Sequence, residues 1–340
     1  MSAHLVAPEG ARLPARQVDD SPPRMPTDDP GPAKRRRAAR AFVAAALLAV
    51  GLAAHAGTPC TETPPSPDAM TRAMVLAEHV QRELDASGAQ VVLLARAGQD
   101  LRKYNLQYSH LAFAYKETLP TAPAPIPIPI PTPVSPLVAM GDPIAIAAAA
   151  AAEPPPAPPV PPPPRTVWRI AHKLNQCGTD RAAVYRQGLG EFFLDSPFEY
   201  RAAFVVPDPE VQAALMPVLT NDRRLVRWNT PRYSVVAYPW ATTYQQSNQW
   251  ALETLAGALD PAAVDRERAQ AWLRLHDYQP TVLHLDAFTR LGARMTRANV
   301  AFDDHPNDQR FSDRIATVTV DSMFAWLQRS HLSGPPTTVY

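Results

Sequence analysis

Proline is the residue that most restricts how this chain can fold, because it fixes φ and removes a backbone hydrogen-bond donor. The sequence has 340 residues and 40 prolines, and 18 of these prolines lie between Pro120 and Pro164 in Ile-Pro and Pro-Pro repeats. Such a stretch favours extended polyproline II or disordered chain and does not pack a core. We therefore interpret it as a disordered insertion in one globular domain. The predicted boundaries are 57–116 for the first part of the domain, 117–165 for the insertion and 166–340 for the remainder.

The N-terminal region has the pattern of an export signal. A basic cluster at 34–40 precedes an uncharged run over 41–54, and Ala54-His55-Ala56 supplies the small-x-small pattern that signal peptidase reads. The apolar run is about fourteen residues long, shorter than the ~20 that a membrane-spanning helix needs. We therefore predict that residues 1–56 form a signal peptide with an extended basic region, removed after Ala56. An uncleaved anchor is the alternative, and Met25 is a second candidate for the first residue.

Charge and motif content narrow the range of partners and cofactors. The formal net charge is +1 and no long basic face carries interleaved aromatic residues, so nucleic acid is not an expected partner. The apolar stretch Leu137–Ala152 is broken by Gly141-Asp142-Pro143, and neither half reaches spanning length, so we expect no membrane span after signal cleavage. There is no Gly-rich phosphate loop and no paired CxxC, and no cofactor is expected.

The chain contains two cysteines, Cys60 and Cys177. Both lie in the predicted mature protein, and an exported protein folds in an oxidising compartment, where such a pair is a natural disulfide. We predict a Cys60–Cys177 bridge that joins the N-terminal segment to the body of the domain. Two separate buried thiols are the alternative.

Hydrophobic periodicity predicts a domain of mixed helices and strands. Helices are expected at Met70–Ser87, Pro209–Leu219, Ser247–Leu259, Asp265–His276 and Asp321–Gln328. Strands are expected at Gln90–Arg96, Tyr108–Tyr115, Val167–His172, Arg201–Val206, Val235–Tyr238 and Ile315–Val320. The predicted fold class is α+β, with a small, mainly antiparallel sheet packed with helices. The strands that flank the insertion would be hairpin partners, so that the proline tract extends from a hairpin tip.

Three polar residues are predicted to converge in this arrangement. His110 lies in one strand, His172 ends the neighbouring strand, and Ser247 opens a helix with Ser247 or Asn248 as its N-cap. A nucleophile at a helix N-terminus gains from the macrodipole, and one histidine could act as its base while the other orients that base. The spacing alone is not a motif. Ser247 as a simple N-cap and His110 as an ordinary core or surface histidine are the alternatives.

A second polar cluster suggests a metal site less strongly. Asp303-Asp304-His305-Pro306, with His284 and Asp286, contains carboxylate and imidazole groups of the kind that bind divalent ions. The cluster lacks the helical histidine spacing of a metallohydrolase, so a solvated turn is favoured and no metal is assigned. The Asp-Asp-His block could instead hold a loop over the site. Gly188-Leu189-Gly190 is interpreted as a turn.

Four blocks of sequence resemble one family. They are Tyr108–Phe113, His172–Gly178, Tyr244–Trp250 and Phe302–Pro306, in the order found in domain-of-unknown-function family 2145. The resemblance runs from about Cys60 to Trp326 and is interrupted by the proline tract. It implies an exported protein of Gram-negative bacteria, periplasmic or secreted, with no established activity.

A weaker resemblance concerns the arrangement of the polar residues. A Ser-His strand followed much later by a nucleophile that opens a helix is similar to circularly permuted, papain-like NlpC-type domains. This resemblance implies His110 as base, His172 as orienting residue and Ser247 in the nucleophile position, where that family has cysteine. A serine hydroxyl is a far weaker nucleophile than a thiol at neutral pH.

Two functions therefore remain open, and the sequence does not decide whether the chain is an enzyme. The first is a non-catalytic binding module of the cell envelope, whose proline tract reaches an envelope partner. The second is an envelope hydrolase or acyltransferase that acts on amide or ester bonds of a peptide-like small substrate. The sequence leaves the oligomeric state open.

Overall fold

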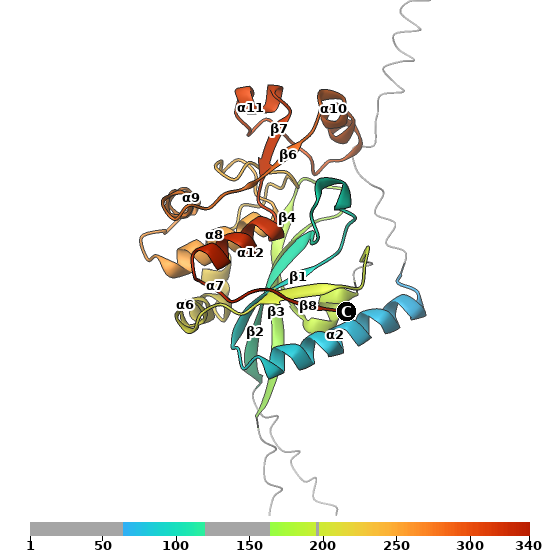
Figure 1. The fold of residues 1–340 in the computed structure, drawn as a ribbon, viewed down its shortest axis with the longest axis vertical. Coiled ribbons are helices and arrows are strands. Elements are labelled where there is room, and N and C mark those ends of the chain that lie inside the picture. The colour runs from blue at the N-terminus through green and yellow to red at the C-terminus, as the bar shows by residue number, and fades with distance from the viewer. Residues whose placement is uncertain (1–63, 120–163, 195–196) are drawn as a thin grey trace, which may run out of the picture. The chain divides into compact units, whose positions relative to one another are not determined.

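The computed structural model describes residues 64–119, 164–194 and 197–340 (Figure 1). The chain divides into two units, Met1–Ala54 and His55–Tyr340, and all described residues belong to the second unit. The predicted signal peptide, Cys60 and nearly all of the insertion lie outside the described residues. The export signal, the choice of first residue and the disulfide therefore stay predictions.

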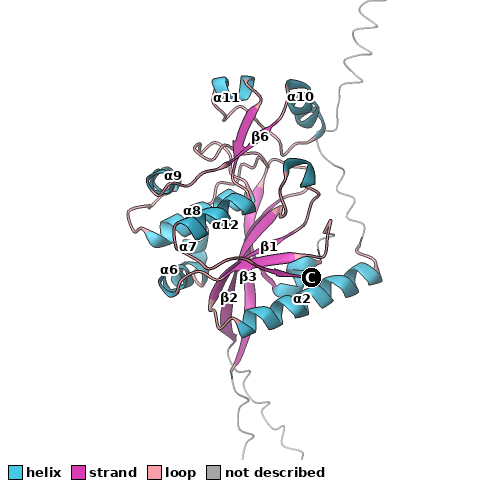
Figure 2. Cartoon of the chain, in the orientation of Figure 1, coloured by secondary structure: helices cyan, strands magenta, loops and turns pink. Residues whose placement is uncertain are grey.

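A six-stranded antiparallel sheet forms the centre of the domain, with the strand order β4-β3-β2-β1-β5-β8 (Figure 2). The strands are β1 Val91–Arg96, β2 His110–Leu119, β3 Arg165–Asn175, β4 Ala182–Gly188, β5 Ala202–Val205 and β8 Thr337–Val339. The strands β1 and β5 are buried throughout, because helices cover both faces of the sheet. An α+β domain with a mainly antiparallel sheet is the predicted fold class, and it is confirmed.

The strands that flank the insertion are hairpin partners, as predicted. β2 pairs with β3 from Leu119 opposite Arg165 to Phe113 opposite Ala171. The insertion therefore leaves the sheet and returns to it at one end of a single strand pair. Such an excursion costs the fold little, because the entropy of loop closure grows only slowly with loop length.

Helices form a layer on each side of the sheet. Their bounds are α2 Pro67–Ala86, α5 Leu189–Phe193, α6 Pro209–Leu219, α7 Asp222–Leu225, α8 Ser247–Leu259, α9 Arg266–Leu275, α10 Ala287–Thr296, α11 Asn307–Phe311 and α12 Val320–Arg329, with a 3-10 turn at Arg102–Tyr104. Successive residues of a strand face opposite sides. Leu111 and Phe113 of β2 accordingly join the core made by α6, α8 and α12, whereas Ala112 and Ala114 join the core made by α2 and α5. None of the helices in the described ranges is both long and apolar enough to cross a bilayer.

A smaller unit, which we call the β6–β7 lobe, comprises residues 281–317 (Figure 1). Its two strands, β6 Thr281–His284 and β7 Arg314–Thr317, pair with each other, and α10 and α11 lie in the segment between them. Leu283, Leu285 and Phe302 of this lobe form a third hydrophobic cluster with Leu106 of the loop before β2. The lobe thus packs beside the end of β2 at which His110 lies.

Three local predictions are wrong, each for a physical reason. The strand expected at Val235–Tyr238 is a turn region, in which the Tyr238 backbone N–H donates to Asp304 and not to a neighbouring strand. β4 was not predicted, because this edge strand carries Arg186, which points inward and donates to the Tyr115 hydroxyl (2.9 Å). Residues 188–190, expected to be a turn, end β4 and begin α5.

The predicted helix caps also need correction. Gln246 caps α8, in place of Ser247 or Asn248, and α12 begins at Val320, one residue before its predicted start at Asp321, with Thr319 as its cap. Gln246 is not a preferred capping residue, but its side chain also bonds Thr317 of β7, whereas Thr319 is a preferred cap and accepts from the Ser322 backbone N–H.

Candidate functional site

His110, His172 and Gln187 form a chain of hydrogen bonds across β2, β3 and β4. His110 Nε2 lies 3.0 Å from His172 Nδ1, and His172 Nε2 lies 2.8 Å from Gln187 Oε1. An amide oxygen only accepts, so His172 donates from Nε2 and, as a neutral ring, accepts at Nδ1 from His110 Nε2. This assignment leaves the lone pair on Nδ1 of His110 as the proton-accepting atom of the chain.

The surroundings of His110 disfavour its charged form. Burial lowers its pKa well below the ordinary value of 6.5, and the positive charge of Arg96 and the neighbouring His172 lower the pKa further. Both imidazole rings pack against Phe192 of α5, with ring centroids 5.9 Å and 5.5 Å away. Arg96 lies over the same phenyl ring and donates to the Phe192 carbonyl. At neutral pH His110 is therefore neutral and able to accept a proton.

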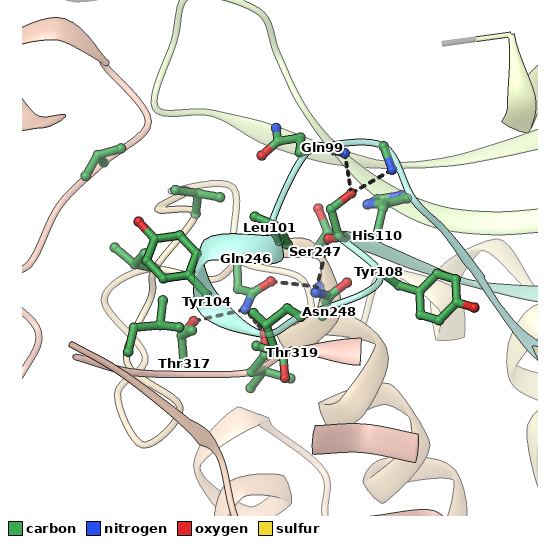
Figure 3. A pocket seen from close by; sticks show the side chains of 18 of the residues that line it. Gln99, Leu101, Tyr104, Tyr108, His110, Gln246, Ser247, Asn248, Thr317 and Thr319 are labelled. Atoms are coloured by element: carbon green, nitrogen blue, oxygen red, sulfur yellow. Dashed lines mark hydrogen bonds between the residues drawn. The ribbon is translucent and has the colours of Figure 1, made fainter. Parts of the chain in front are cut away.

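The start of α8 is fastened to two strands by its first polar residues. Gln246, the N-cap, accepts from the Asn248 backbone N–H (3.1 Å) and donates to the Thr317 hydroxyl of β7 (3.1 Å). Asn248 accepts from the Leu111 backbone N–H of β2 (2.9 Å). These contacts hold Ser247, the first residue of α8, between the end of β2 and the β6–β7 lobe (Figure 3).

Tyr233 and Ser247 line the same cavity, and burial raises the pKa of the Tyr233 phenol while the Ser247 side chain opposes that shift. Within the part of the chain that the structure describes, no hydrogen bond joins Ser247 to His110. The alternation of β2 explains the separation. His110 shares the α5 side of the sheet, where it packs on Phe192, while α8 packs on the opposite side, where Trp250 contacts Phe113 at a centroid distance of 5.8 Å.

His110 and Ser247 nevertheless meet at one cavity of about 430 Å³ (Figure 3). Tyr233, Asn248 and Ser109 line the same cavity, and residues of the β6–β7 lobe form its other wall. The structure thus brings all three predicted residues to one region. It joins the two histidines directly and places Ser247 at the same cavity without a hydrogen bond to them.

Several residues of this site were not predicted. Gln187 lies on the strand that was missed, and Tyr233 lies in a loop whose sequence has no periodicity. Arg96 was assigned only to a buried strand, although an arginine that ends a buried strand is itself a signal, because a buried charge requires partners.

A second polar network lies on the α8 side of the sheet and supports the same helix start. Lys173, the residue after His172, is fully buried and donates to the Thr230 carbonyl (2.6 Å) and to Gln245 Oε1 (2.7 Å). Burial, and to a smaller extent the positive charge of Arg266, lower its pKa to about 7, while Glu253 opposes the shift. Gln245 lies two residues before Ser247, so this network fixes the segment that leads into α8.

The charges of this network are balanced by an ion pair inside the protein. Glu253 and Arg266 lie 2.7 Å apart with side chains only 1% and 8% exposed. Arg266 also donates to three backbone carbonyls and to a threonine hydroxyl, those of Ala241, Thr242, Tyr244 and Thr230. Gln245 donates to Glu253 Oε2 (2.5 Å) and so links Lys173 to the pair.

The Asp303-Asp304-His305 block is not the solvated turn that was favoured. The Asp304 and His305 side chains are fully buried and lie 2.9 Å apart, and the other His305 ring nitrogen lies 2.9 Å from the Ala316 carbonyl of β7. Asp304 also accepts from the Tyr238 backbone N–H (2.8 Å). The block therefore joins the loop before α8 to the β6–β7 lobe, which is the alternative that the sequence left open.

The remaining members of the metal hypothesis lie in ordinary structural positions. His284 ends β6, and Asp286 caps α10 by accepting from the Thr289 backbone N–H (2.9 Å). Among the described residues there is no group of three or more histidine, cysteine, aspartate or glutamate side chains placed to hold a metal ion. Cys177 lies in the turn after β3, and its predicted partner Cys60 lies outside the described residues.

Comparison with known proteins identifies the family. A family model described as "Uncharacterized protein conserved in bacteria (DUF2145)" matches residues 83–123 and 147–327. No curated protein matches the chain, and no solved structure matches it. The matched ranges contain β1 to β3, both histidines, the start of α8 and the β6–β7 lobe. The chain therefore belongs to the DUF2145 family, whose members are uncharacterized proteins conserved in bacteria.

Proposed function

We propose that this chain is an exported, periplasmic or secreted envelope protein with a papain-like, permuted NlpC-type core, and that its cavity binds a ligand without cleaving it. The observation that carries the proposal is the hydrogen-bond partner of His110. Its Nε2 lies 3.0 Å from His172 Nδ1, and among the described residues no hydrogen bond joins His110 to Ser247. A serine hydroxyl attacks a carbonyl only when an adjacent base removes its proton.

Tyr233 is not a substitute for that base. A phenol is neutral at physiological pH, and burial raises the pKa of Tyr233 above its ordinary value. His110, whose Nδ1 lone pair is the proton-accepting atom, belongs to the opposite side of the sheet from the packing surface of α8. The site thus has polar groups that can recognise a ligand, but its hydroxyl and its base are not paired.

Two further observations support the other parts of the proposal. The basic cluster, short apolar run and Ala54-His55-Ala56 pattern support export. The order of the site residues along the chain supports a permuted papain-like core, because a histidine on β2 and one on β3 precede the helix that Ser247 opens.

A serine-directed fluorophosphonate probe tests the proposal directly. The chain from residue 57 onward is incubated with the probe beside its Ser247→Ala variant, and labelling is compared by mass spectrometry. We expect equal labelling of the two proteins, because an unactivated serine does not react. Labelling of Ser247 that disappears in the variant would overturn the non-catalytic function.

A second candidate is an envelope hydrolase or acyltransferase that uses Ser247, His110 and His172 on an amide or ester. The observation in its favour is the His110–His172–Gln187 chain, which orients a neutral imidazole toward proton transfer. In this case substrate binding would bring the Ser247 hydroxyl and His110 together.

The Ser247→Cys variant separates the two candidates. A latent active site would give this cysteine faster alkylation than an ordinary exposed cysteine, for which Ser312→Cys is the control because Ser312 is exposed. We expect alkylation of Ser247→Cys at or below the control rate, as the binding function requires.

A further inference from the structure

The cavity at Ser247 has two chemically different ends (Figure 3). One end carries polar side chains from three segments of the chain, namely His110, Tyr233, Ser247 and Asn248. The other end is lined by aliphatic and aromatic side chains of the third hydrophobic cluster, contributed by the loop before β2 and by the β6–β7 lobe. Its volume of about 430 Å³ lies in the range of small-molecule sites.

The apolar end offers few hydrogen-bonding groups, and the Tyr104 phenol, which packs against the same cluster, is one of them. Leu101, Leu106, Leu283, Leu285 and Phe302 line it and carry no polar side-chain atoms. Water at such a surface finds few hydrogen-bond partners. A hydrocarbon that replaces the water removes apolar area from solvent, which stabilises the complex by roughly 25 cal/mol per Å². A ligand that uses this end is therefore apolar along its length.

The threonines that border the apolar end are already satisfied within the protein. The Thr317 hydroxyl accepts from Gln246 and donates to the Ala237 carbonyl (3.3 Å). The Thr319 hydroxyl lies 2.6 Å from that of Thr281 and accepts from the Ser322 backbone N–H (3.0 Å). A peptide would bring amide groups that need partners on this wall, and burying them unpaired is costly. A plain hydrocarbon chain carries no such requirement.

The polar end suits an oxygen-rich head group. It lies at the start of α8, a helix of 13 residues, where the macrodipole favours negative charge or a polarised carbonyl oxygen. The Ser247 and Tyr233 hydroxyls lie beside it and can donate to such an oxygen. This end would therefore take a carboxylate or an ester, with its chain continuing toward the lobe.

We propose that the cavity binds a single-chain acyl group, with its carboxylate or ester carbonyl at Ser247 and its hydrocarbon chain against the β6–β7 lobe. The inference rests on the proposed binding function and specifies its ligand class. The acyl group comes either from a free fatty acid or from a lipid, and both present the same chemistry to the cavity.

Calorimetric titration with octanoate tests the inference, with acetate as the probe that has the head group but no chain. Octanoyl lysophosphatidylcholine represents the lipid source, and acetyl-leucyl-leucine amide represents an apolar peptide. We expect octanoate or the lysolipid to bind and acetate not to bind. Equal affinity for octanoate and acetate, or binding of the peptide alone, would overturn the acyl proposal.

A matched pair of variants on α10 tests where the hydrocarbon chain of the ligand binds. Ala293 lines the cavity, whereas Met295 is 43% exposed on the same helix and does not line it. Ala293→Phe fills the apolar end and should weaken octanoate binding by about tenfold or more, while Met295→Phe should leave it unchanged. If Ala293→Phe does not fold, Val300→Phe narrows the same wall from the following loop. Unchanged octanoate affinity in a folded, cavity-filled variant would contradict the assignment.

These results are distinguishable from failure of the proposed function. If octanoate and the lysolipid fail to bind, the acyl proposal is wrong. The proposed binding function would still stand as long as Ser247 stays unlabelled by the fluorophosphonate, and the cavity could still bind the peptide probe. Labelling of Ser247 would overturn the non-catalytic function, yet octanoate affinity that falls in Ala293→Phe would still identify the chain-binding wall.

Discussion

Two buried polar networks lie on opposite sides of the same strand, and they differ in how completely they are satisfied. On the α5 side, His110, His172 and Gln187 form a neutral chain that ends at an imidazole lining a cavity. On the α8 side, Lys173 joins an ion pair, Glu253 and Arg266, within the core. His172 and Lys173 are consecutive residues of β3, so the alternation of one strand assigns them to different environments.

The Glu253–Arg266 network is suited to a structural role, whereas the histidine chain is suited to contact with a ligand. The guanidinium of Arg266 makes hydrogen bonds from Nε and both terminal nitrogens, and the carboxylate of Glu253 accepts from several partners, so neither has capacity left for a ligand. Among the described residues no hydrogen bond involves Nδ1 of His110, which lines the cavity, and the neutral state of His110 avoids the desolvation cost of a charge. A substitution in one network should change stability or titration there and leave the other network unaffected.

The largest effect is expected for Arg266→Met. It leaves the Glu253 carboxylate buried without its counter-charge, which typically costs about 3–5 kcal/mol of unfolding free energy. Arg268→Met is the matched control, because among the described residues Arg268 forms an ion pair with exposed Asp265, at 3.8 Å, and its loss should cost well under about 1 kcal/mol. Urea denaturation measures both. Equal losses for the two variants would show that the buried pair has no special role in stability.

Lys173→Met should have an intermediate effect at neutral pH. It leaves the Thr230 carbonyl and Gln245 Oε1 without this donor, at a cost of about 1–3 kcal/mol. The variant should also lose a pH dependence of the wild type. Above about pH 7 folded Lys173 is neutral while the unfolded lysine, with its ordinary value of 10.5, still binds a proton.

The sign of that pH dependence follows from proton binding. Between the folded pKa of about 7 and the unfolded pKa of 10.5, the unfolded state binds more protons. Wild-type stability should therefore rise with pH in this range, by at most about 1.4 kcal/mol per pH unit. Below about pH 7 both states are protonated and this contribution is constant. Urea denaturation across this window compares wild type with Lys173→Met. A stability difference between them that does not change with pH would contradict the lowered pKa.

The smallest effect is expected from the histidine chain, and its pH dependence lies in a lower window. Because the pKa of His110 is well below 6.5 when folded, the unfolded state binds more protons as pH falls through that value. Wild type should therefore lose stability below about pH 6.5, by at most about 1.4 kcal/mol per pH unit, and His110→Gln should lose less. Arg96→Met should raise the His110 titration midpoint in NMR, and an unchanged midpoint would remove Arg96 as a cause.

Much of the fold could be predicted because its elements carry strong local signals. The range of α6 was predicted residue for residue, since Pro209 opens it and the polar pair at 221–222 follows it. β1 was recognised as a continuous apolar run, and the hairpin of β2 and β3 followed from the insertion between them. β4 was missed because an edge strand with inward-pointing arginine lacks an alternating apolar pattern.

The sequence by itself determined the α+β class and the family resemblance, and it predicted that His110, His172 and Ser247 lie near one another. These depend on local pattern: periodicity, a residue at the end of a strand, and a residue at the start of a helix. Only the tertiary structure decided that the two histidines are hydrogen-bonded to each other while Ser247 lines the cavity from the start of α8. The physical reason is that hydrogen-bond partners are set by strand register, by the side of the sheet that each residue faces and by loop packing. Those quantities link residues far apart along the chain, and no local pattern records them.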